Sequence, residues 1–394
     1  MSFVETQLEQ ARIGLELEDE GFAPVESSVV KTSLWWRVFG GIGSVPGFLF
    51  RYASWVGMLA VLAAVPVVNL YVLGLLIEVQ GRVAKSKRWL IELPGIRVAS
   101  QLGTITIWAW VWLVPIRILA SYARDAHLIS LGSIADQRLE TGLVIVQVMI
   151  AVHLLMALMA GGRTWNFLNP VVNVWRITRH VRQGTLWGRW DATLSAMQED
   201  LQPWRYFVLG LKGLLGAAVW LVPPTVLFAA AQKPEGGAFL VMLFGGTLLS
   251  LVLTWLPGLQ TLFAREHRWR DYFRMREARE MLARRPALWT IGMLFFFALG
   301  LPLYLFKIIT PPADAMWLVT LIYIATVLPA KFIVGWLVRV SAEGARTPWY
   351  WRLPWYVVQT SICLFYVFLI FFTQNIAEDG KLALFKQHLF VLPF

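Results

Sequence analysis

Residues 287–306 read ALWTIGMLFFFALGLPLYLF, a run without a single charged side chain. A helix of about 20 apolar residues is long enough to cross the hydrocarbon core of a bilayer. Within that core each backbone N–H and C=O group must be satisfied inside its own segment, which a helix achieves and an isolated strand does not. This stretch therefore predicts a transmembrane helix.

Six further runs have the same length and polarity. They lie at about 102–123, 141–161, 206–231, 237–264, 315–338 and 353–377. Only 15% of the chain is charged, whereas a typical soluble domain has about 25% charged residues. The 21 Trp and 24 Phe also suit a membrane protein, because aromatic rings anchor helices at both membrane surfaces. The predicted fold class is all-α, a polytopic transmembrane helix bundle with seven clear spans.

The run from 48 to 79, FLFRYASWVGMLAVLAAVPVVNLYVLGLLIEV, adds either one Pro-broken span or a hairpin. It is long for one span and short for two, and Pro66 interrupts it near the middle. A single kinked span would place the N-terminus outside, whereas a hairpin of two short helices would keep it in the cytoplasm. The chain begins with a long polar tail and no signal-peptide pattern, which favours the hairpin.

The distribution of charge predicts the domain organisation and the orientation. We expect an acidic polar tail at 1–46, a transmembrane helical domain at 47–377 and a C-terminal tail at 378–394. Four alternate linkers hold 21 basic residues, against six in the opposite linkers and the C-terminal tail. These basic linkers are 80–101, 162–204, 265–286 and 339–352. Because Lys and Arg are retained in the cytoplasm, we expect a multi-pass protein of the cell (cytoplasmic or inner) membrane with cytoplasmic basic loops and an external C-terminus.

Three stretches in the basic linkers have helical amphipathic periodicity: RDYFRMREAREMLARRP (270–286), NPVVNVWRITRHVRQ (169–183) and WDATLSAMQEDL (190–201). The apolar face of the first holds Tyr272, Met275, Ala278, Leu282 and Ala283. In the second, Asn169 suits an N-cap and Pro170 suits the first helical turn. We expect cytoplasmic helices lying in the headgroup layer, with anionic lipids as partners of their basic faces.

Residues 65–95, VPVVNLYVLGLLIEVQGRVAKSKRWLIELPG, combine four features. These are an apolar–Pro–apolar turn at Pro66, Gly74 in the following helix, the basic run Arg82–Arg88, and Leu93-Pro94. The combination resembles an uncharacterised, mainly prokaryotic family of multi-spanning membrane proteins with a domain of unknown function. The chain departs from that family at Leu75, where the family has an aromatic residue, and at Gly95-Ile96, where it has a polar–aromatic pair. The resemblance implies a multi-spanning fold and no known activity.

Ionisable side chains inside apolar runs are costly and mark candidate functional positions. Five residues qualify: Glu78, Arg117, His153, Lys212 and Lys331. Glu78 and Arg117 could pair, since their segments are neighbours in the chain. Lys331 follows Pro329, and broken helices line transport sites. The plainer interpretation places Glu78, Arg117 and Lys212 near the membrane surface and gives His153 a hydrogen bond to a neighbouring helix.

The sequence contains no motif for a cofactor, a metal or catalysis. Cys363 is the single cysteine, and the five histidines lie too far apart for a metal-site spacing. The glycines at 40–47 precede an apolar run rather than a strand–helix turn, which argues against dinucleotide binding. Membrane orientation explains the basic loops better than nucleic acid does. We expect no cofactor, no metal and no nucleic-acid partner.

Three functions are compatible with these features. The first is a structural, assembly or partner-docking membrane subunit, favoured by the amphipathic stretches, whose partner is another protein or a second copy of the chain. The alternative is a small-solute or lipid transporter, favoured by the Pro-containing spans and Lys331. A lipid-active membrane enzyme ranks third, because the spans supply almost no paired carboxylates or histidines. We therefore do not expect the chain to be an enzyme.

Overall fold

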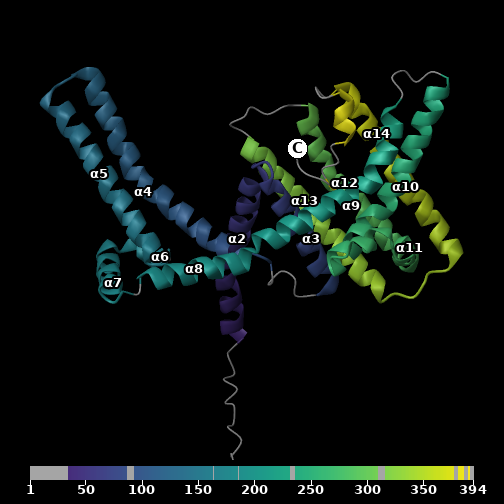
Figure 1. The fold of residues 1–394 in the computed structure, drawn as a ribbon, viewed down its shortest axis with the longest axis horizontal. Helices are drawn as coiled ribbons and strands as arrows, with labels where there is room; N and C mark the ends of the chain where they lie inside the picture. The colour runs from purple at the N-terminus through teal and green to yellow at the C-terminus, as the bar shows by residue number, and fades with distance from the viewer. Residues whose placement is uncertain are drawn as a thin grey trace, which may run out of the picture. The chain divides into compact units, whose positions relative to one another are not determined.

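The computed structural model describes residues 34–86, 93–162, 164–184, 186–230, 236–308, 316–376, 380–385 and 389–390. Every regular element within these ranges is a helix (Figure 1), which confirms the predicted all-α fold class. The chain divides into two compact units, Met1–Phe48 and Leu49–Phe394. The contacts discussed below all lie within the second unit.

The helices follow one another along the chain with short connections. They are α2 (Leu34–Ala63), α3 (Val68–Lys85), α4 (Ile96–Ile129), α5 (Ile134–Met159), α6 (Thr164–Leu168), α7 (Pro170–Arg182), α8 (Leu186–Leu201), α9 (Pro203–Ala229), α10 (Gly237–Glu266), η1 (Trp269–Phe273), α11 (Met275–Arg284), α12 (Pro286–Ile308), α13 (Met316–Ala342), α14 (Trp349–Ile376) and η3 (Gly380–Phe385).

Eight segments in the described part of the chain are long and apolar enough to cross a membrane. Seven of them coincide with the seven predicted spans and belong to α4, α5, α9, α10, α12, α13 and α14. The eighth, Pro46–Ala63, is the end of α2. The architecture is that of an integral, multi-pass membrane protein.

The run from 48 to 79 forms two helices separated by a turn. α2 ends at Ala63 and α3 begins at Val68, with Pro66 between them. Val67 adopts a φ of 71°, which a β-branched residue rarely takes, and the chain reverses there (Figure 1). Trp55 Nε1 in α2 donates a hydrogen bond of 2.8 Å to the carbonyl of Pro94, which lies beyond the far end of α3. These observations favour the hairpin over the single kinked span.

α3 is the central helix of the bundle and packs against α9, α10 and α13. Nearly every residue from Tyr71 to Ala84 is buried. The closest approach is at Gly74, where an added Cβ would lie 1.8 Å from the carbonyl oxygen of Tyr206 in α9. A Cβ added at Gly210 in α9 would likewise lie 1.9 Å from the carbonyl oxygen of Leu70. Small residues at this crossing therefore let the two backbones touch.

α4 and α5 form an antiparallel pair outside this bundle (Figure 1). Their main contacts are with each other and with α6, α7 and α8. α4 extends past the predicted span at both ends, because polar residues such as Arg124 and Asp125 continue the helix beyond the apolar run. At the turn, Ser133 caps α5 by accepting a hydrogen bond of 3.1 Å from the backbone N–H of Asp136.

The amphipathic stretch at 270–286 forms η1 and α11, and the bundle itself covers its apolar face. Tyr272, Ala278 and Leu282 are buried, and α11 packs against α10, α12 and α13. Tyr272 Oη donates a hydrogen bond of 3.1 Å to the carbonyl of Gly213. The buried ring and its satisfied hydroxyl explain why this face turns toward protein, whereas the sequence led us to expect it to face the headgroup layer.

The stretch at 169–183 forms α7 with the predicted cap. Asn169 Oδ1 accepts a hydrogen bond of 3.2 Å from the N–H of Val172, and Pro170 is the first helical residue. In contrast to α11, α7 leaves its apolar face uncovered, and Val171 is 75% exposed.

Candidate functional site

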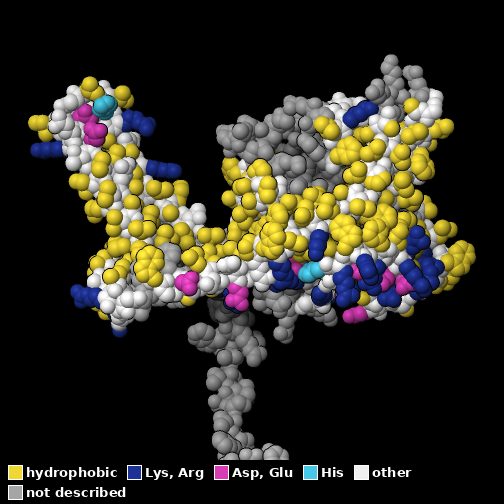
Figure 2. All heavy atoms as spheres, viewed as in Figure 1, with side chains coloured by type: hydrophobic (Ala, Val, Ile, Leu, Met, Phe, Trp, Pro, Cys, Tyr) yellow, Lys and Arg dark blue, Asp and Glu magenta, His cyan; other side chains and the backbone are white. Residues whose placement is uncertain are grey.

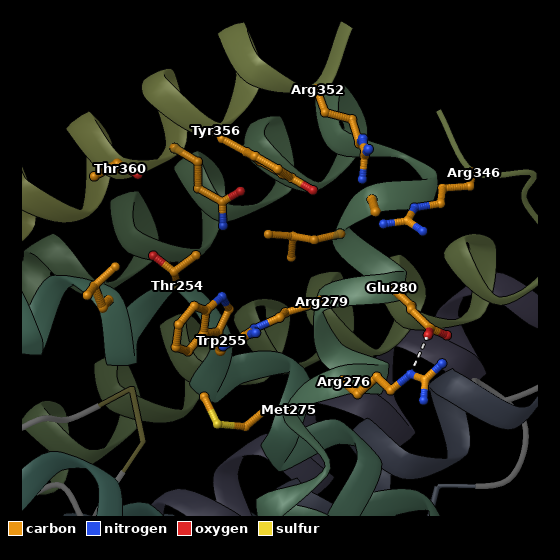
Figure 3. Close-up of a pocket in the computed structure, with 14 residues that line it drawn as sticks. Thr254, Trp255, Met275, Arg276, Arg279, Glu280, Arg346, Arg352, Tyr356 and Thr360 are labelled. Carbon is orange, nitrogen blue, oxygen red and sulfur yellow. Dashed lines mark hydrogen bonds and ion pairs between the residues drawn. The ribbon is translucent and has the colours of Figure 1, made fainter. Parts of the chain in front are cut away.

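A cavity of about 760 Å³ lies between α10, α11 and α14 (Figure 3). We call it the arginine pocket, because four of its lining residues are Arg276, Arg279, Arg346 and Arg352. Glu280 is the one acidic residue in its lining, which leaves a formal surplus of three positive charges. Its remaining wall is largely apolar and includes Leu251, Trp255, Met275 and Leu282.

Because one face of α11 is buried in the bundle, the orientation of the helix is set, and with it the direction of Arg276 and Arg279. The guanidinium of Arg279 lies 4.9 Å from the centroid of the Trp255 ring in α10, which is a cation–π contact. Arg276 Nε pairs with Glu280 Oε1 at 3.2 Å (Figure 3). α11 thus supplies one arginine held on an aromatic ring and one held in an ion pair.

Hydrogen bonds tie the segment before α14 to the end of α11 and so position Arg346. The N–H of Thr347 donates to the carbonyl of Ala283 at 3.1 Å, and its hydroxyl donates to the carbonyl of Arg284 at 2.8 Å. These contacts hold Arg346 against the rim of the pocket.

One face of α14 forms the third wall. Arg352, Tyr356 and Thr360 lie four residues apart and Gln359 lies three residues after Tyr356, so these four residues share one side of the helix. Figure 3 shows Arg346, Arg352 and the hydroxyl of Tyr356 pointing toward the same part of the pocket. Two guanidinium groups and a phenol hydroxyl therefore converge there.

The pocket contains polar groups without partners. Gln359 is 1% exposed, and neither its Oε1 nor its Nε2 has a hydrogen-bond partner. The buried Nε of Arg352 also lacks one. No carboxylate among the described residues pairs with Arg279, Arg346 or Arg352. An unsatisfied buried polar group costs about 1–3 kcal/mol, so these groups favour a ligand that accepts hydrogen bonds.

The chemistry of the pocket is that of anion binding. Guanidinium groups are planar and fork-shaped and match the oxygens of phosphate, and they stay charged at any physiological pH. The one carboxylate, Glu280, is engaged by Arg276. Within the described ranges, no group of three or more His, Cys, Asp and Glu side chains could hold a metal ion.

Glu78, one of the five residues singled out from the sequence, lies in a second cluster of charges where α3 meets α9 and α10. Its Oε1 is 2.9 Å from Arg82 Nε, and its Oε2 is 3.2 Å from His267 Nε2 and 3.7 Å from Arg205 Nη2. Glu78 therefore contacts these three residues, while Arg117 is exposed on α4. The structure does not bring Glu78 and Arg117 together as the sequence suggested.

The charge of Glu78 follows from these contacts. α3 is not among the helices long and apolar enough to span the membrane. Burial by itself would raise the pKa of the Glu78 carboxyl, but the contacts with His267 and Arg82 outweigh it and hold the pKa at about 2. Glu78 is therefore ionised, and it compensates the positive charges around it.

His153 joins α5 to the short helix α6. Its Nε2 lies 2.9 Å from the carbonyl of Phe167, which also accepts a hydrogen bond of 3.0 Å from Trp112 Nε1 in α4. The rings of Trp112 and His153 meet edge to face at 4.7 Å. His153 thus makes the hydrogen bond to a neighbouring helix that the plainer interpretation of the sequence predicts. Together the contacts of His153 and Trp112 hold α4 and α5 against α6.

Lys331 and Lys212 have opposite environments. Lys331 is buried in α13, and its Nζ donates a hydrogen bond of 2.5 Å to Gln260 Oε1 in α10. α13 continues through Pro329 as one helix from Met316 to Ala342. Lys212 is exposed on α9. None of the five residues singled out from the sequence lines the arginine pocket.

The residues of the arginine pocket escaped the sequence criterion for two reasons. Arg276, Arg279 and Arg346 lie in linkers, where charge is expected, so their type carried no signal. Gln359 is a polar residue inside the apolar run 353–377, which is a signal in the sequence, but it is not ionisable and so does not meet the criterion. Only the packing of α11 and of α14 against α10 brings these residues to one cavity.

The chain matches no model of a known protein family, no curated protein and no solved structure. The resemblance of residues 65–95 to an uncharacterised membrane-protein family therefore stays a prediction.

Proposed function

We propose that this integral membrane protein binds the anionic, phosphate-bearing headgroup of a membrane lipid in the arginine pocket. The observation that carries the proposal is the convergence of arginines without carboxylate partners and the buried, unpartnered Gln359 on one cavity. A phosphate satisfies both, because it is negatively charged and accepts hydrogen bonds on several oxygens.

The position of the pocket favours a lipid over a soluble anion. Its lining comes in part from α10 and α14, two helices that are long and apolar enough to span a membrane, and Leu251 and Trp255 of α10 belong to its apolar wall. Figure 2 shows charged side chains in a band along the lower edge of the bundle in this view, below a broad hydrophobic surface. A lipid headgroup at the boundary of these two surfaces has its hydrocarbon beside the apolar wall.

Lipid binding in the arginine pocket bears on two of the functions that are compatible with the sequence. Lipid handling is one form of the transport alternative. In the assembly interpretation, which ranked first, a protein partner or a second copy takes the place of the lipid. Both interpretations predict that a second molecule, either a lipid or a protein, is extracted from the membrane together with this protein.

Removing the pocket arginines is expected to remove the bound lipid. We expect native mass spectrometry of the gently extracted protein to show an anionic lipid adduct, and the double variant Arg346→Gln/Arg352→Gln to lose it. Charge-assisted hydrogen bonds contribute about 1.5–3 kcal/mol each, so each substitution should weaken binding by roughly tenfold or more. Glutamine removes the charge while keeping a polar side chain.

Arg268→Gln/Arg270→Gln is the matched control, because both arginines are exposed and neither lines the pocket. It removes the same two charges and should leave the lipid adduct intact. Equal loss of lipid in the control and in the double variant would mean that total charge, and not the pocket, holds the lipid. A stoichiometric protein partner without a lipid adduct would contradict the proposal and favour an assembly function.

We also infer that the basic loops and the N-terminal tail are cytoplasmic and that the C-terminus is outside, with α2 and α3 forming a hairpin that enters the membrane from the cytoplasmic side and returns to it. The support is the charge bias of the linkers together with the turn between α2 and α3. The single cysteine, Cys363, is buried and should contribute little background to thiol labelling. With an impermeant thiol reagent on intact cells, Leu382→Cys should be labelled, since Leu382 is 67% exposed. Ser27→Cys should be labelled only after permeabilisation, and its labelling in intact cells would contradict this orientation.

A further inference from the structure

A groove continues from the arginine pocket along α14. A cavity of about 380 Å³, whose lining residues all lie on α14, shares Tyr356 and Thr360 with the arginine pocket. It shares Leu364 with a third cavity, of about 290 Å³, that α9, α10 and α14 line. We call this series of cavities, from Tyr356 to Phe372, the chain groove.

The spacing of the lining residues shows that the groove follows a single ridge of each helix. On α14 the lining includes the series Arg352, Tyr356, Thr360, Leu364, Phe368 and Phe372, each four positions after the last, together with some of their neighbours. On α10 it includes Leu243, Thr247, Leu251 and Trp255, with the same spacing. Positions four apart stack along one helix face, so the groove runs lengthwise along α14, and α10 lines its two ends.

The surface of the groove is apolar even where its residues are not. Thr247 Oγ1 donates to the carbonyl of Leu243 at 2.8 Å, and Ser361 Oγ donates to the carbonyl of Val357 at 3.0 Å. These hydroxyl groups are satisfied within their own helices. Beyond Leu364 the lining includes Phe368 and Phe372. Such a surface suits hydrocarbon.

The length of the groove limits what fills it. The helix rises by about 24 Å along α14 over the sixteen steps from Tyr356 to Phe372. The hydrocarbon core of a bilayer is about 30 Å thick, so one leaflet is about 15 Å deep. A single chain that fills the groove from the arginine pocket onward therefore passes the middle of the membrane.

We propose that the chain groove holds the hydrocarbon chain of the lipid whose headgroup lies in the arginine pocket, and that this lipid is a phosphate with one chain longer than a leaflet. Polyisoprenyl phosphates are the class that fits. The surplus of positive charge matches the two negative charges of a phosphate monoester better than it matches a zwitterionic headgroup. This inference rests on the proposed function, because the headgroup site places the start of the chain.

The test compares two ligands with the same headgroup and different chains. The full-length protein, in nanodiscs of phosphatidylcholine, is titrated with farnesyl phosphate and with a long polyisoprenyl phosphate. We expect the long-chain ligand to bind about tenfold more tightly, which corresponds to about 1.4 kcal/mol. In Leu364→Trp, the larger ring blocks the groove beyond Thr360, so the long-chain affinity should fall to that of farnesyl phosphate, whose own affinity should not change.

Phe365→Trp is the matched control, because Phe365 is 60% exposed on α14 and lines none of the three cavities. It should bind both ligands as the unmodified protein does. Equal affinity for the two chain lengths, or the same response in both tryptophan variants, would overturn the chain groove and leave the headgroup site standing. Failure of both ligands to bind, or binding that Arg346→Gln/Arg352→Gln leaves unchanged, would overturn the proposed function itself.

Discussion

Replacing Gly74 by alanine is expected to disrupt the bundle. The new Cβ would lie 1.8 Å from the carbonyl oxygen of Tyr206 and 2.9 Å from the backbone nitrogen of Gly210. Both obstacles are backbone atoms, so no side-chain rotation relieves the clash and α3 must separate from α9. Overpacking of a core costs about 1–3 kcal/mol, and a backbone clash in the central helix should reach or exceed the upper end of that range. The readout is the melting temperature and the monodispersity of the purified protein.

Gly57→Ala provides the control for this substitution. Gly57 lies in α2, and an added Cβ there meets nothing within 4 Å. Alanine favours a helix over glycine by about 1 kcal/mol, so this variant should be as stable as the unmodified protein or slightly more stable. Similar melting temperatures for the two alanine variants would show that α3 and α9 do not touch at Gly74.

Replacing Glu78 by glutamine is expected to lower the free energy of unfolding by about 2–4 kcal/mol. The amide has the same shape as the carboxylate but no charge, and it leaves Arg82, Arg205 and His267 facing one another without compensation. We expect a smaller loss of unfolding free energy than for a fully buried ion pair, because these three partners are partly exposed to solvent. Thermal unfolding in detergent measures the difference.

The effect of Glu78→Gln should depend on pH in a defined direction. The pKa of Glu78 is held at about 2, below its ordinary value of 4.5, so its contribution to stability is complete above pH 4.5. That contribution is lost as the pH falls toward 2, and the variant and the unmodified protein should then converge. Glu266→Gln, at the exposed end of α10, is the control and should stay within about 0.5 kcal/mol of the unmodified protein. Matching behaviour of the two glutamine variants would argue that solvent already screens Glu78.

Hydropathy predicted the spans well, because each one depends on its own composition. The run 287–306 is a helix in the structure, as are the other six predicted spans. The same criterion left 48–79 ambiguous. α3 carries Glu78, Arg82 and Lys85 and fails the test for a span, yet it is the most enclosed helix of the bundle. Its burial depends on Gly74 and Gly81, which let α9 and α10 approach, and composition does not reveal that.

The ionisable residues in apolar runs mark contacts between helices but do not mark the pocket. Glu78, His153 and Lys331 are all buried and all contact groups on other helices. Arg117 and Lys212 are exposed. A buried ionisable residue need not face a cavity, because a neighbouring side chain or carbonyl can satisfy it. The arginines of the pocket lie in linkers, where charged residues are common, and they share one cavity only because α11 and α14 both pack against α10.

The sequence by itself determined the fold class, the positions of the spans and the amphipathic character of 270–286, since each depends on residues close together in the chain. Only the tertiary structure decided that α3 forms the centre of the bundle, that the apolar face of 270–286 packs against the bundle, and that Arg279, Arg346 and Gln359 share one cavity. The physical reason is that a span needs only enough apolar surface to leave water. The arginine pocket needs α14, which is distant in sequence, to pack against α10 beside α11.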